Sequence, residues 1–139
     1  MHMQVHMQAL GETEILELWE RGLARHPIDR ALLLCAWARP DLPPSRFPDL
    51  PLGVLNRALL RLRETCFGPR IIAWVDCEHC GEYMEVALDT GQLLAGANED
   101  DMPAEFEISS FRFRVPCSRD LAAIIGQRDI TAATMKLLQ

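Results

Sequence analysis

Two cysteines in the segment CEHCG, Cys77 and Cys80, are the residues of this chain best suited to chemistry. Thiolates two residues apart at a tight turn can bind one metal ion, and Gly81 behind them lets backbone amides point toward the sulfur atoms. A structural zinc site needs four ligands. The segment therefore predicts half of a zinc-ribbon site.

The other ligands of such a site are not evident in the sequence. Cys117 is a candidate third ligand if the strand before it pairs with the hairpin that carries the two cysteines. Cys66 is a weaker candidate, and His79 would point away. A complete site then needs a further group, a symmetric partner subunit or a segment beyond Gln139. A redox pair and reduced cysteines without metal stay open as alternatives. A thioredoxin-like motif starts a helix, whereas this one joins two strands, which favours a metal.

No other pattern in the chain predicts catalysis. Carboxylate pairs such as Glu14 and Glu17 are routine on helix surfaces, and no GxSxG elbow, phosphate-binding glycine loop or HExxH motif occurs. Acidic residues around the cysteines, among them Asp76, Glu78 and Glu82, repel phosphate and are expected to raise the cysteine pKa values. We therefore expect a protein that is not an enzyme and does not bind nucleic acid.

The composition is ordinary for a globular domain, with 49% hydrophobic residues, 24% charged residues and a net charge of −6. The longest apolar run, residues 31–38, is too short to cross a bilayer, so no membrane partner is expected. The five cysteines are an odd number in apolar surroundings, which predicts a reducing, cytoplasmic compartment. Cys35 and Cys66 lie in helical patterns and are expected in the core.

The elements that must position the cysteines follow from the apolar spacing, and together they predict a single α+β domain over residues 1–139. Residues 1–10 are expected to be disordered, and residues 11–68 and 118–139 to be helical. The proline-rich residues 40–51 should form a loop rather than a helix. The tryptophans are expected to be core residues: Trp19, Trp37 and Trp74.

The stretch 70–116 predicts a small antiparallel sheet. Residues 70–76 and 82–89 form a hairpin around the cysteine turn, and residues 106–116 form a third strand with one wet, basic face. Every second residue of the second strand is apolar, which predicts a buried face there. Acidic residues gather between the first and third strands, including the run 99–101. The buried residues expected on the second strand are Met84, Val86 and Leu88.

Four stretches carry a resemblance to a known family: residues 16–40, 50–71, 76–89 and 111–124. In these stretches the chain resembles the baseplate hub assembly chaperones of T-even phages, a family also met in phage-like contractile injection systems. Longer members of this family carry a second CxxC-Gly knuckle, so the resemblance implies a bound zinc ion. In this chain it implies only Cys77 and Cys80 as zinc ligands.

The resemblance implies a non-enzymatic protein that helps baseplate hub or wedge components fold and associate in the bacterial cytoplasm. Its partners would be other baseplate or tail proteins, with a homodimer as a further possibility. The acidic hairpin and the basic third strand are the expected docking surfaces. The alternative is a free-standing zinc-ribbon-like adaptor or a small regulatory protein.

Overall fold

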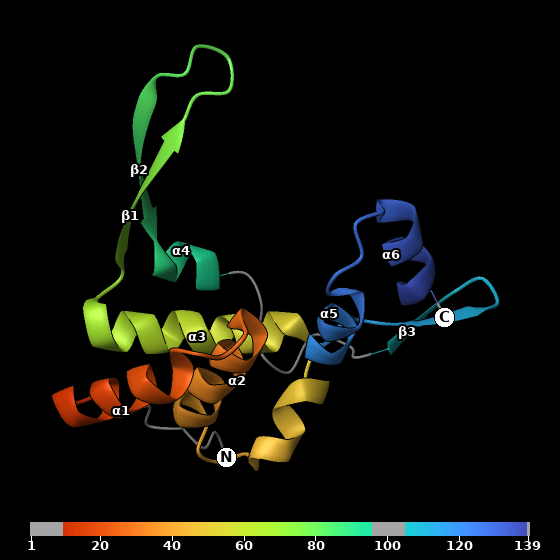
Figure 1. Ribbon diagram of the computed structural model, residues 1–139, viewed down its shortest axis with the longest axis horizontal. Coiled ribbons are helices and arrows are strands. Elements are labelled where there is room, and N and C mark those ends of the chain that lie inside the picture. The colour runs from red at the N-terminus through yellow and green to blue at the C-terminus, as the bar shows by residue number, and fades with distance from the viewer. Residues whose placement is uncertain (1–9, 96–104, 139) are drawn as a thin grey trace.

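The structure is a computed structural model that describes residues 10–95 and 105–138. Helices form a body from which two separate antiparallel β-hairpins project (Figure 1). This arrangement confirms the predicted α+β class. Apart from Leu10, the expectation of disorder in residues 1–10 lies outside the described residues, as does the acidic run 99–101. The helices of the body are α1 (Glu12–Gly22), α2 (Pro27–Ala38), the 3-10 helix η1 (Pro44–Asp49) and α3 (Leu52–Phe67).

The core of the body lies between α2, η1 and α3. The expectation that residues 40–51 contain no helix is wrong, because Pro44 begins η1, where a proline ring fits a first helical turn. This turn places Phe47 in the centre of the core, where its exposed fraction is 1%. The buried core residues are Cys35, Ala38, Phe47, Leu55, Ala58 and Leu62.

The three tryptophans do not share one environment. Trp37 on α2 packs against the core, as expected. Trp19 on α1 is 66% exposed, because α1 contacts α2 through its buried residues Leu18 and Gly22 instead. Trp74 is 52% exposed. The core prediction is therefore wrong for Trp19 and Trp74.

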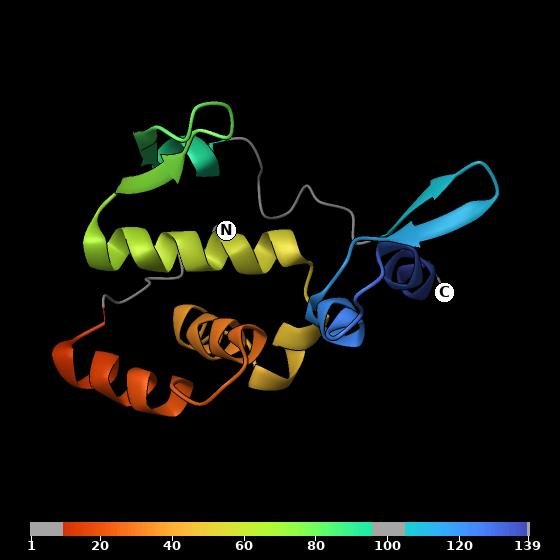
Figure 2. The same ribbon diagram turned by 45° about the horizontal axis from the view of Figure 1, so that its top comes forward.

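The first hairpin consists of β1 (Arg70–Asp76) and β2 (Tyr83–Asp89), which confirms both predicted strands. It leaves the end of α3 through Gly68, whose φ of 79° lies in the left-handed region that favours glycine. The Arg63 guanidinium donates hydrogen bonds to the carbonyls of Gly68 and Arg70, which fixes the base of the hairpin to α3. Helix α4 (Thr90–Leu94) then folds back, so that α3 lies between α2 and this hairpin (Figure 2).

The expected single strand at 106–116 is wrong. The chain instead forms a second hairpin from β3 (Glu105–Ile108) and β4 (Phe111–Arg114), joined by a turn in which Ser109 has φ 58°. In residues 10–95 and 105–138 this hairpin pairs only with itself, so these residues form two two-stranded sheets rather than one three-stranded sheet. The cause is local: the two serines separate two short alternating runs that can pair across the turn.

The last helices are α5 (Ser118–Ile124) and α6 (Ile130–Leu137), within the region predicted to be helical. Pro51 and Cys117 form an isolated β-bridge that joins the start of α5 to the start of α3. The Leu52 N–H donates to the Pro116 carbonyl (3.0 Å) at the same place. The ion pair between Arg119 and Asp49 adds a contact between α5 and η1.

Candidate functional site

The turn that carries Cys77 and Cys80, called the knuckle below, is closed by two backbone hydrogen bonds. The Cys77 N–H donates to the Glu82 carbonyl (2.8 Å), and the Gly81 N–H donates back to the Cys77 carbonyl (2.7 Å). Gly81 has φ 70°, and no described residue other than its two chain neighbours has an atom within 4 Å of the position that a Cβ would take. Glycine is therefore favoured here by backbone conformation rather than by lack of space. Both cysteines are free thiols, Cys80 exposed and Cys77 half-buried.

Hydrogen-bond donors surround the Cys77 sulfur. The backbone amides of Cys80 and His79, followed by the Cys80 side chain, lower the pKa of Cys77 because they stabilise its thiolate. The expectation that flanking carboxylates raise the pKa is therefore wrong for Cys77: the amides touch the sulfur, whereas exposed carboxylates act through water. A stabilised thiolate suits a metal ligand, and it equally suits a reactive thiol.

The knuckle contains only two cysteine ligands, and the structure does not bring Cys117 to them. Among the described residues, no three His, Cys, Asp or Glu side chains lie where they could hold a metal ion together. Cys117 is buried at the start of α5 because β4, which leads to it, pairs with β3 rather than with the first hairpin. The proposed third ligand is therefore not supported by this structure.

Cys117 instead belongs to the cap of α5. Its backbone N–H donates to Asp120 Oδ2 (2.8 Å), and the Arg114 guanidinium donates to both oxygens of the same carboxylate (2.6 and 2.7 Å). Arg114 first, and then the Cys117 amide, hold the pKa of Asp120 well below its usual range. On the same strand, Arg112 pairs with Glu107 (3.6 Å). The basic face expected on this strand is therefore largely neutralised by neighbouring carboxylates.

The remaining two cysteines behave as core residues, as expected. Cys35 has no exposed surface, and burial raises the pKa of its thiol to about 11. Cys66 is half-buried against the core and accepts a hydrogen bond from the Leu10 N–H (3.5 Å). Neither contributes to the knuckle.

One whole face of the first hairpin is apolar. The register places Ile71 opposite Leu88, Ala73 opposite Val86 and Val75 opposite Met84, and directly opposed residues share a face. We call these six residues the apolar ribbon face. The alternation on β2 was predicted correctly, but its burial was not: Met84, Val86 and Leu88 are all exposed.

The opposite face of this hairpin is mixed. Trp74 stacks on Tyr83, with ring centroids 5.2 Å apart and an interplanar angle of 2°. Acidic side chains flank this pair, including Glu85 opposite Trp74 and Asp76 opposite Tyr83. The hairpin therefore combines an uncovered apolar face with an acidic tip that carries the two cysteines.

The second hairpin repeats the same design on a smaller scale. Its register pairs Phe106 with Phe113 and Ile108 with Phe111, which puts four large apolar side chains on one exposed face. The first half of this face was not predicted, because the predicted strand ran through Ser109 and Ser110. Two small polar residues between two alternating runs are a turn signal that could have revealed it.

No known protein family, curated protein or solved structure matches this chain. The described residues define an α+β protein whose helical body carries two exposed, apolar-faced hairpins, one of them with a cysteine knuckle at its tip. None of the helices that the structure describes is long and apolar enough to span a membrane.

Proposed function

We propose that this chain is a non-enzymatic assembly protein for the baseplate of a contractile phage tail or a phage-like injection system. In this role it acts in the cytoplasm by binding other baseplate or tail proteins. The single observation that carries the proposal of protein binding is the exposed apolar ribbon face. The resemblance of the sequence to baseplate assembly chaperones supports the class of partner.

The physical argument starts from the instability of a two-stranded ribbon. Such a ribbon is at best marginally stable alone, and it gains stability when another layer covers its apolar side. Here neither Val75 nor Val86 on that side is covered by the body of the same chain. Within the part of the chain that the structure describes, each strand has only one neighbour, so both outer edges can accept a further strand. A partner protein can cover the apolar side and pair with an open strand edge at the same time.

The charge of the hairpin indicates the kind of partner. Arg70 at its base is the only cation of residues 70–89, whereas Asp76, Glu78, Glu82 and Glu85 lie at or near its tip. A surface of this sign repels phosphate backbones and favours a basic protein surface. We therefore expect protein partners with basic residues near the contact, and no nucleic acid.

Cys77 and Cys80 fit zinc as two of its four ligands, because their turn has amide donors aimed at sulfur. We propose that the remaining two ligands come from another chain, either a partner protein or a second copy. Zinc bound there would crosslink the hairpin tip to that chain and would do no catalytic chemistry.

Native mass spectrometry of protein purified without chelator tests whether zinc is shared between chains. We expect zinc in complexes of two or more chains and none tightly held by the monomer. One zinc held tightly by each monomer would overturn it.

Co-purification tests the proposed function. The full chain is mixed with each hub and wedge protein of a contractile tail from the same genome. Val86→Glu adds a charge to the apolar ribbon face, and Ala87→Glu adds the same charge to the opposite face of β2. We expect the wild type and Ala87→Glu to bind one of these proteins, and Val86→Glu to bind about ten-fold more weakly or worse.

The proposal fails if no baseplate protein binds, or if both variants bind as the wild type does. A chain that binds zinc and none of the baseplate proteins would support the alternative. That alternative, a zinc-ribbon-like adaptor or regulatory protein, is favoured by the geometry of the knuckle alone.

A further inference from the structure

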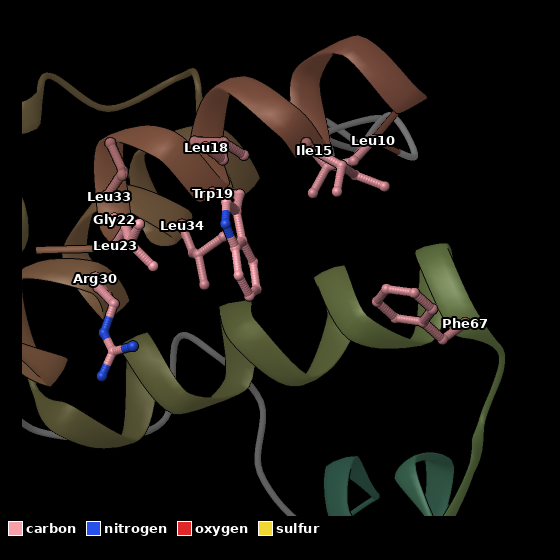
Figure 3. Close-up of a pocket in the computed structure, with 10 residues that line it drawn as sticks. All are labelled: Leu10, Ile15, Leu18, Trp19, Gly22, Leu23, Arg30, Leu33, Leu34 and Phe67. Carbon is pink, nitrogen blue, oxygen red and sulfur yellow. The ribbon is translucent and has the colours of Figure 1, made fainter.

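The helical body also carries an uncovered apolar surface, a groove between α1 and α3 whose floor is α2. Its cavity volume is about 290 Å³. In Figure 3, Trp19 and Leu34 point into the space between α1 and α3, and Phe67 faces that space from α3. Trp19 and Phe67 are 66% and 71% exposed, so residues 10–95 and 105–138 leave both walls of the groove open.

One wall of the groove is a regular stripe along α1. Ile15, Trp19 and Leu23 follow one another at four-residue spacing, which puts them on the same side of the helix. The stripe runs for about 12 Å, or about two helical turns. Leu18, which faces α2, is already buried, so this stripe is additional to the surface that holds α1 on the body.

The lining of the groove decides what shape of chain can lie in it. The three helices around the groove satisfy their own backbone hydrogen bonds, and the groove side chains are almost all apolar. A peptide lying in this groove must therefore satisfy its own backbone groups. An α-helix does so, whereas an extended strand does not.

One cation marks one end of the groove. Of the lining residues that the structure describes, only Arg30 is charged, and its aliphatic stem lies beside Gly22 at the end of α1. Among the described residues, the Arg30 side chain makes no hydrogen bond or ion pair. Figure 3 places its guanidinium at the Leu23 end of the groove, away from Phe67. A carboxylate on an occupant would pair with it there.

We propose that this groove binds an amphipathic helix of a partner protein. The helix presents large apolar side chains at three- to four-residue spacing over about two turns, and an Asp or Glu at the end that meets Arg30. This surface lies on the helical body and is independent of the apolar ribbon face. The inference therefore does not require the baseplate function.

Two synthetic peptides of about 18 residues, long enough to form a helix alone, test the inference by fluorescence anisotropy with the full chain. Both carry leucines at this spacing; one has a Glu at the end of its apolar stripe, and the other has a Lys there. We expect the Glu peptide to bind about five-fold more tightly, because an accessible ion pair contributes up to about 1 kcal/mol.

Charge reversal provides the decisive variant. Arg30→Glu should reverse the preference so that the Lys peptide binds more tightly, whereas Arg25→Glu, at an arginine outside the groove, should leave it unchanged. Trp19→Ala should weaken both peptides by about ten-fold because it removes the largest apolar contact. Circular dichroism shows whether each variant is folded.

Three results would overturn the inference. The first is that neither peptide binds the folded wild type. The second is that Arg30→Glu prefers the Glu peptide over the Lys peptide to the same extent as the wild type. The third is a concentration-dependent dimer that Trp19→Ala abolishes, because the groove would then belong to a second copy of this chain.

Discussion

The α2–η1–α3 core of the helical body and the first hairpin both contain apolar side chains in regular patterns, yet only the core buries them. Phe47 and Leu55 in the body are almost completely buried, whereas Val75 and Val86 on the apolar ribbon face are exposed. The difference does not lie in the strands themselves, since their register is regular along the whole hairpin. It lies in what stands next to them: α2 and η1 cover α3, and no described element covers the hairpin.

An alternating pattern specifies the two faces of a strand but not what covers either face. Alternation fixes which side chains share a face, because the side-chain period of a strand is two residues. It does not fix whether the same chain supplies the covering layer. An uncovered face of this kind is most simply explained by a surface that another chain covers.

The largest effect expected from the comparison is a difference in stability between its two sides. Phe47→Ala should lower the free energy of unfolding by about 3–5 kcal/mol, because it leaves a cavity in the core. Val86→Ala should lower it by less than about 1 kcal/mol, because Val86 is exposed and its removal leaves no cavity. Urea denaturation followed by circular dichroism measures both. Equal losses would show that the hairpin is covered in solution, and the comparison would be wrong.

A smaller effect is expected at the turn of the hairpin. Gly81→Ala should cost about 1–2 kcal/mol locally, since an L-residue is strained at the φ of 70° found there. Amide exchange of β1 and β2 should become faster, while the exchange of α3 amides should not change. Gly53→Ala is a matched control, because Gly53 is exposed within helix α3. Faster exchange throughout the molecule would show that the hairpin does not open independently of the body.

The smallest effect concerns acid stability at α5, the helix that joins the second hairpin to the body. The Asp120 pKa is lowered in the folded state, so its contribution is present above its unfolded pKa of about 4 and is lost as the pH falls below that value. Asp120→Asn should therefore lower Tm by a few degrees at pH 7, and by less at pH 3. An equal difference in Tm at both pH values would exclude this carboxylate as a source of acid sensitivity.

The elements of the fold were largely predictable, because they depend on neighbours in the sequence. Proline and glycine positions marked the ends of α3, and alternation marked β1 and β2. The unpredicted turn at Ser109 also depends on sequence neighbours, because Ser109 and Ser110 separate two alternating runs. The fold class needed only these local patterns and was predicted correctly.

The candidate site was predictable only in part, because it depends on contacts between distant residues. The knuckle is a local structure, and Cys77 and Cys80 have the predicted turn geometry. The position of Cys117 depends on which strand β4 pairs with, and the exposure of Trp19 depends on which side of α1 faces α2. Neither choice is encoded in the spacing of apolar residues along the chain.

Hydrogen exchange of the full chain, alone and with each hub and wedge protein of a contractile tail, tests the central claim most directly. If the first hairpin is the docking element, the amides of residues 70–89 should exchange quickly in the free chain and become protected in the complex. The core amides of α3 should be protected in both. A complex that forms without any added protection in residues 70–89 would contradict the account.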